Sequence, residues 1–184
     1  MKKILFSILM VSLVSACSIN TVQYQPDFNL VNEMKDSNLQ KMSVGDISSK
    51  NPNVNKVSIR GSSMVSTFNN SYAKYLEVAL REQLHQANLY DSSSAISIVG
   101  ELLTNKVNAA GFSVGTAEIS ARFEVLNSDK VIFDKVVTIV HEWDSSFAGA
   151  IAIPNAQNNY PIAIQKLISK LMTDQDFISS VQGG

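Results

Sequence analysis

The chain has 184 residues, of which 45% are apolar and 17% are charged. These values are typical of one compact domain and exclude collagen-like and low-complexity chains. The net charge of −1 leaves no basic stripe for nucleic acid, and two histidines with one cysteine offer neither a cluster of metal ligands nor an intramolecular disulfide. We therefore expect no metal, no other cofactor and no nucleic-acid partner.

The first residues of the chain have the features of an export signal. Lys2 and Lys3 form a positive start, and the apolar run from Ile4 to Val14 follows them. A run of about 11 residues has the length of a signal-peptide core and is too short to span a bilayer, which takes about 20 residues. We predict that residues 1–16 are a signal peptide.

The signal ends in Val14-Ser15-Ala16-Cys17, which resembles the bacterial lipobox at every position. This resemblance implies cleavage between Ala16 and Cys17 and attachment of acyl chains to the Cys17 sulfur, so that the membrane itself is a partner. By similarity to enterobacterial sorting signals, Ser18 in place of an aspartate directs the protein to the periplasmic face of the outer membrane. The alternative is an ordinary secretory signal, with Cys17 a free thiol.

Residues 17–53 are rich in Asn, Ser, Gln and Asp, and we predict a flexible tether there, with Phe28, Leu30 and Val31 as candidates for local packing. The folded body is then a single periplasmic domain over residues 54–184. A short strand is expected at 54–60, before Gly61. The domain's first helix is expected at 71–87, where apolar residues recur at steps of three and four.

The middle of the chain alternates in the manner of strands. Strands are predicted at 95–104, 115–126 and 131–143, the last two joined by a hairpin turn. The clearest is 115–126, in which one face of the strand is apolar and the other polar. A helix follows at 160–172, and Thr173-Asp174 begins a last short one.

Together these elements predict an α+β fold in the order β-α-β-β-β-α-α. An antiparallel sheet of about four strands would carry two longer helices packed on one face.

Three stretches resemble the YajG family of bacterial lipoproteins and, more remotely, PqiC-type auxiliary lipoproteins. They are Leu80 to Leu84 in the first helix, Gly115 to Phe123 in the clearest strand, and Leu171 to Ile178 near the end of the chain. Each is expected to carry the fold, so the resemblance implies a shared scaffold. It supplies no activity and no catalytic residues.

Two short motifs could in principle carry chemistry. Gly111 to Gly115 has the spacing Gly-x-Ser-x-Gly, and Ser113 with His141 and Asp144 would be the members of a serine hydrolase triad. A nucleophile elbow requires a helix directly after the serine, whereas a strand is predicted here. In His141-Glu142-Trp143-Asp144 a second histidine at metal-ligand spacing is missing, and neighbouring strand residues point to opposite faces.

The run from Phe147 to Pro154 is almost wholly apolar, although it is predicted to link a strand to a helix. Links are normally polar, so this run either closes the open end of the core or lines a groove for a partner or an acyl chain. The candidate contact residues are Trp143, Phe147, Ile151, Ile153 and Tyr160.

The sequence favours a non-catalytic lipoprotein that binds an envelope protein or lipid. The alternative is a periplasmic serine hydrolase that uses Ser113.

Overall fold

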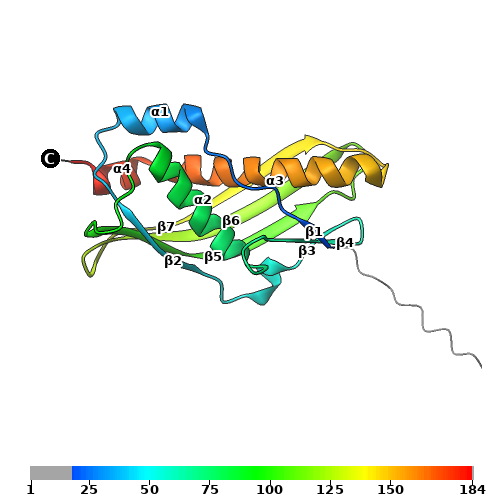
Figure 1. Cartoon of the computed structure of the whole chain (residues 1–184), viewed down its shortest axis with the longest axis horizontal. Helices are drawn as coiled ribbons and strands as arrows, with labels where there is room; N and C mark the ends of the chain where they lie inside the picture. The colour runs from blue at the N-terminus through cyan, green and yellow to red at the C-terminus, as the bar shows by residue number, and fades with distance from the viewer. Residues whose placement is uncertain (1–17, 184) are drawn as a thin grey trace, which may run out of the picture.

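The structure is a computed structural model that describes residues 18–183 (Figure 1). It has the predicted α+β class. A four-stranded sheet of order β2-β5-β6-β7 carries helices on one face, and a small sheet of order β1-β4-β3 lies beside it. The four strands of the larger sheet are β2 (Ser43–Ser48), β5 (Ile96–Asn108), β6 (Val114–Asn127) and β7 (Lys130–Asp144).

Strand β6 confirms the alternation predicted for residues 115–126. Ala117, Ile119 and Phe123 are fully buried on the helix-covered face, whereas Arg122 is exposed on the other. β6 pairs with β5 and β7 in antiparallel register, and the turn between Asn127 and Lys130 is the predicted hairpin. The inward face of the sheet is therefore the floor of the core, and its outward face meets solvent.

Helix α2 (Tyr72–Gln86) begins where the sequence predicts, with the Ser71 hydroxyl accepting a hydrogen bond from the Lys74 amide at 3.1 Å. Helix α4 (Gln175–Val181) begins in the same way, since the Asp174 carboxylate accepts hydrogen bonds from two backbone amides of the first turn. These two predicted starts are confirmed because each depends only on a local cap.

Helix α3 (Gly149–Met172) is longer than the predicted helix at 160–172. It includes the apolar run that we expected to be a link, and it continues through Pro154 and Pro161, each of which removes only one backbone hydrogen bond. Ala152 and Ala156 are fully buried at steps of four residues, and Tyr160 continues the same row. Their burial on one helix face explains why this segment is helical.

The prediction of a flexible tether over residues 17–53 is wrong for residues 18–53. They form β1 (Ser18–Asn20), α1 (Phe28–Asp36) and β2, and β2 pairs in parallel with β5 as the fourth strand of the larger sheet. Leu30 and Val31 pack locally as expected, whereas Phe28 is exposed. The sheet is consequently mixed rather than wholly antiparallel.

The strand predicted at 54–60 is also placed differently. Residues Pro52–Asn55 form a 3-10 helix, η1, and only β3 (Val57–Ile59) is extended. β3 pairs with β4 (Ser62–Val65) in the small sheet, so it contributes nothing to the hydrogen bonds of the larger one.

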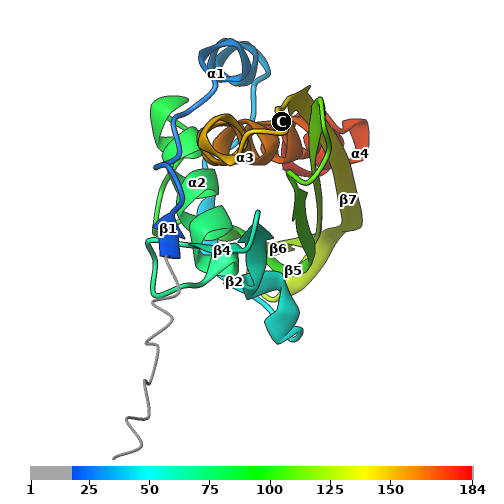
Figure 2. The ribbon, with the colours of Figure 1, turned by 90° about the vertical axis from the view of Figure 1, so that its right-hand side faces the viewer.

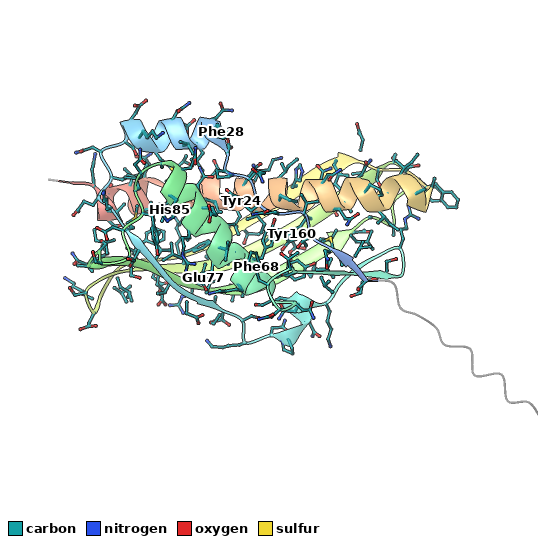
Figure 3. The ribbon with its side chains drawn as sticks, in the orientation of Figure 1. Tyr24, Phe28, Phe68, Glu77, His85 and Tyr160 are labelled. Atoms are coloured by element: carbon teal, nitrogen blue, oxygen red, sulfur yellow. The ribbon has the colours of Figure 1, made fainter. Side chains whose placement is uncertain are left out.

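Tyrosines from α2 and α3 meet in the core, where Tyr160 of α3 is fully buried (Figure 3). The Tyr160 ring contacts Tyr72 and Tyr75 edge to face, with centroids 5.1 and 5.6 Å apart. The Tyr160 hydroxyl donates a hydrogen bond to Asn105 Oδ1 at 3.0 Å, and the Asn105 amide donates to the Val54 carbonyl at 2.8 Å. Buried polar groups here are paired, as the interior requires.

Candidate functional site

The structure divides the predicted contact residues into two groups. Tyr160 and Trp143 are buried, and Trp143 lies against Gly115 so closely that a side chain on that glycine would collide with the indole. Phe147 and Ile151 are 68% and 52% exposed, and Ile153 is half-buried against the core. The prediction of one surface made of all five is wrong, because successive residues on a strand or helix point in different directions.

An aromatic pair that the sequence did not predict contains one of the exposed residues. Phe112, in the loop between β5 and β6, is 77% exposed and stacks on Phe147 with centroids 5.3 Å apart and an interplanar angle of 10°. Val114 and Ile151 are exposed apolar side chains on the segments that adjoin the two loops. We call these four residues the aromatic tip.

Arg60 holds the two loops of the aromatic tip together. Arg60 and Gly61 form the two-residue turn between β3 and β4, both with positive φ (53° and 82°), a conformation that glycine adopts without strain. The Arg60 guanidinium donates hydrogen bonds to the Gly111 carbonyl at 3.0 Å and to the Ser146 carbonyl at 2.8 Å. It also lies 5.9 Å from the centroid of the Phe147 ring.

The same turn lies beside the first residue that the structure describes. Ser18 is paired with Ser63 in the parallel ladder between β1 and β4, and Ser63 is three residues from Arg60. Figure 2 looks onto this end of the molecule, with β1, the turn before β4 and the first turns of α3 toward the reader. The start of the described chain and the aromatic tip are therefore joined through one short hairpin.

The segments that form the aromatic tip contain no charged residue. Residues 107–117 and 145–165 lack Asp, Glu, Lys and Arg altogether. Two acidic residues border the tip, since Asp144 pairs opposite Val114 in the ladder and Glu142 lines the same shallow pocket as Val114. This end of the molecule can therefore contact an apolar phase while Arg60, the charge behind the tip, is paired with backbone carbonyls.

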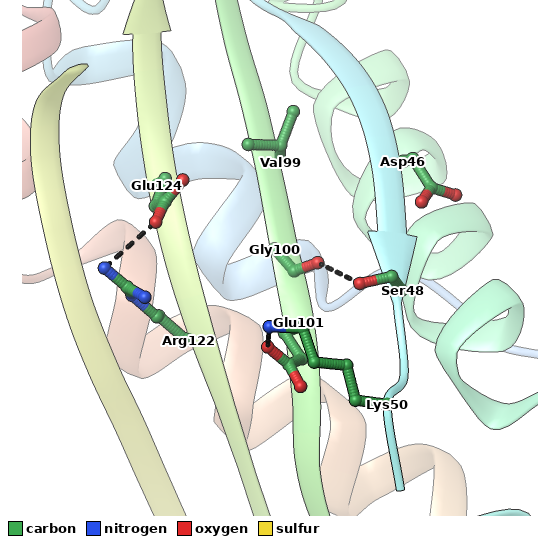
Figure 4. Close-up of a pocket in the computed structure, with 8 residues that line it drawn as sticks. All are labelled: Asp46, Ser48, Lys50, Val99, Gly100, Glu101, Arg122 and Glu124. Atoms are coloured by element: carbon green, nitrogen blue, oxygen red, sulfur yellow. Dashed lines mark hydrogen bonds and ion pairs between the residues drawn. The ribbon is translucent and has the colours of Figure 1, made fainter. Parts of the chain in front are cut away.

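The outward face of the sheet differs from the aromatic tip in its charge. A shallow cavity of about 310 Å³ lies over β2, β5 and β6 and is lined by charged side chains (Figure 4). Lys50 pairs with Glu101 at 2.9 Å, and Arg122 pairs with Glu124 at 3.1 Å and with Asp134. The Arg122 hydrogen bond lowers the pKa of the Asp134 carboxyl. Four of the five charged side chains that line this cavity are thus engaged in ion pairs.

Ser113 and His141 do not form the contact that a hydrolase needs. His141 is opposite Ala117 in the ladder, four residues from Ser113, or about 13 Å along the strand. The His141 ring nitrogens instead contact Asn159 Oδ1 at 3.0 Å and Lys166 Nζ at 2.8 Å. Burial lowers the pKa of His141, and the hydrogen bond to Asn159 partly opposes this shift.

The described residues, 18–183, offer neither a cluster of metal ligands nor a membrane-spanning helix. His141 is buried and Glu142 is exposed, which confirms that they point to opposite faces. Within this range no three His, Asp or Glu side chains are grouped as metal ligands would be, and no helix is both long and apolar enough to cross a bilayer. Ala16 and Cys17 lie outside the described residues.

No family model and no curated protein matches the sequence. Among solved structures, a DUF330 protein from Xanthomonas campestris is similar at 12% identity and a TM-score of 0.58, covering 85% of this chain and 95% of its own. A putative lipoprotein from Caulobacter crescentus is 10% identical with a TM-score of 0.48, and the match covers 82% of this chain and 93% of that protein. A minor lipoprotein from Acinetobacter baumannii is 14% identical with a TM-score of 0.45, and the match covers 79% of this chain and 96% of that protein. The first likeness shows a shared fold.

Proposed function

We propose that this chain is a lipid-anchored protein of the bacterial envelope whose body binds another envelope component and performs no catalysis. One observation carries the proposal: a complete lipobox ends at Cys17, and the next residue, Ser18, already belongs to a paired strand of the folded body. The position of Ser18 after the lipobox supports the periplasmic face of the outer membrane as the location.

The anchor would hold the body at the membrane without a spacer. Neighbouring Cα atoms lie about 3.8 Å apart, so the acylated sulfur would be within one side-chain length of β1. Each buried methylene of an acyl chain contributes about 0.8 kcal/mol, and several chains on one cysteine give stable attachment where a single chain does not. The folded body would therefore stay in contact with the lipid surface.

Several polar side chains of the core, Glu77 and His141 among them, are held by structural partners, and this supports binding rather than catalysis. Glu77 is buried in α2, where its carboxylate accepts hydrogen bonds from Lys74 and Arg81 at 2.6 Å each (Figure 3). The burial of the Glu77 carboxylate is explained by these two cations. His141 is likewise bonded to Asn159 and Lys166.

The anchor is tested by metabolic labelling with an alkyne fatty acid and by mass spectrometry of the mature N-terminus. We expect label on the wild type, none on Cys17→Ser, and a mature chain that begins at residue 17. Ser18→Asp should move the labelled protein from the outer to the inner membrane, whereas the matched control Ser18→Ala should remain in the outer membrane. Label on Cys17→Ser, or a different mature N-terminus, would contradict the anchor.

The absence of catalysis is tested separately with a fluorophosphonate probe, which reacts with activated serine hydroxyls. We expect the same low background for the wild type and Ser113→Ala. Labelling that disappears in Ser113→Ala would overturn the non-catalytic proposal and favour the hydrolase.

A further inference from the structure

We infer that the aromatic tip inserts into the bilayer that holds the acyl chains, so that the body stands on the membrane at this end. The inference rests on the lipid anchor proposed above and adds an orientation and a second membrane contact. In this orientation α4 lies at the far end of the molecule's long axis (Figure 1).

The first step of the argument is geometric. Cys17 is bonded to Ser18, Ser18 pairs with Ser63, and Ser63 is three residues from Arg60 in the turn before β4. Arg60 in turn holds both loops of the tip through the Gly111 and Ser146 carbonyls. An acyl anchor at residue 17 therefore brings the tip to the lipid surface without any rearrangement of the body.

The second step concerns the chemistry of the tip. Phe112 and Phe147 expose most of their surface as one stacked pair, and Val114 and Ile151 add aliphatic surface beside them. Large apolar side chains gain free energy when they leave water, and aromatic rings are favoured at the interface between headgroups and acyl chains. The absence of charge from residues 107–117 and 145–165 removes the cost of desolvating ions there.

The third step concerns rigidity. The loops that carry Phe112 and Phe147 are bound to each other, since the Ser145 amide donates to the Ser113 carbonyl at 2.7 Å, and both are bound to Arg60. The tip is thus formed before it meets a membrane, so insertion costs little ordering of the chain. A bilayer is the occupant we assign because the lipid-attachment signal directly precedes Ser18 in the sequence, and Ser18 pairs with Ser63 close to the turn that carries Arg60.

The test uses the full, lipidated protein in vesicles of phosphatidylethanolamine and phosphatidylglycerol. Acylation consumes the thiol of the single native cysteine, so an introduced cysteine is the only thiol open to a fluorescent NBD label. Ser113→Cys places the label on the tip, and Ser179→Cys in α4 is the matched control. Both serines are exposed, and both substitutions exchange only oxygen for sulfur.

We expect the label at residue 113 to shift to shorter wavelength and to lose intensity when the lipids carry bromine on their acyl chains. The label at residue 179 should show neither change and should be quenched by aqueous iodide. Adding Phe112→Ser and Phe147→Ser to the Ser113→Cys protein should reverse the shift at residue 113, with an unaltered melting temperature as the control for folding.

Three results would overturn the inference. If both labels stay open to iodide while the protein floats with the vesicles, the anchor stands and the insertion fails. If residue 113 is shielded from iodide but not quenched by brominated lipid, protein rather than lipid covers the tip. If the chain carries no acyl group and leaves the vesicles, the proposed function fails together with the inference.

Discussion

Strand β6 and the first turns of α3 are both rich in apolar residues, yet the protein uses them in opposite ways. In β6 every second side chain, from Ala117 to Val125, is buried under the helices. In α3 Ala152 is fully buried, whereas its neighbour Ile151 is half exposed on the aromatic tip. Apolar composition alone therefore does not show whether a segment fills the core or forms a surface.

The largest effect is expected in β6. Phe123→Ala removes a fully buried ring that packs between the sheet and the helices, and it should lower the free energy of unfolding by about 3–5 kcal/mol. Its neighbour Glu124, which points to the outward face, is the control, and Glu124→Ala should cost within about 0.5 kcal/mol. Urea unfolding followed by circular dichroism measures both, and similar midpoints would contradict the orientation of β6.

The same contrast can be tested inside α3 with one substitution placed on either face. Ala152→Asp introduces a carboxylate without a partner into the core and should cost about 3 kcal/mol or more. Ile151→Asp places the same group in solvent and should change the stability by less than about 1 kcal/mol. Equal loss of stability would show that the apolar run closes the core on both faces.

Arg60 connects the aromatic tip to the small sheet, and its loss should have a smaller effect. Arg60→Gln removes charged hydrogen bonds to two carbonyls and should cost about 1.5–3 kcal/mol. The control Arg122→Gln disrupts an exposed ion pair and should cost less than about 1 kcal/mol. Hydrogen exchange should speed up at residues 145–148 in Arg60→Gln only; unchanged exchange would show that other contacts fix the loops.

How far the sequence predicts this fold depends on the range of the interactions that form each element. β6, its hairpin and the starts of α2 and α4 depend on local alternation, turns and caps, and all four are predicted correctly. β2 is not, because the pairing register shifts between Val44 and Ile47, and its partner β5 lies some 50 residues away. Its strand character comes from that distant pairing.

The aromatic tip is only half predictable for the same reason. Phe147 and Ile151 belong to an apolar run that is visible in the sequence, whereas Phe112 and Arg60 lie far from it in the chain. Arg60, in the two-residue turn with Gly61, joins the loop that carries Phe112 to the loop that carries Phe147. No local sequence pattern indicates which loops the Arg60 side chain reaches. Trp143 and Tyr160 flank the apolar run in the sequence, but β7 and α3 turn both side chains into the core, and no local pattern indicates that α3 begins at Gly149.

The smallest predicted effect lies between the sheet and α3, at His141 of β7. Its ring contacts Asn159 and Lys166 of α3, and burial lowers its pKa below the ordinary 6.5. The His141 ring of the unfolded chain therefore binds a proton more readily than that of the folded chain. The stability that neutral His141 contributes is present above pH 6.5, and it is lost as the pH falls from 6.5 toward the lower pKa of the folded state. Protonation would also place an imidazolium beside the Lys166 ammonium.

We expect the melting temperature of the wild type to fall between about pH 7.5 and about pH 5.5, and that of His141→Gln, whose side chain does not titrate, to fall less over the same range. Scanning calorimetry at matched ionic strength measures both slopes. Equal slopes would mean that His141 titrates alike in the folded and unfolded chain and that its contact with α3 does not depend on its charge.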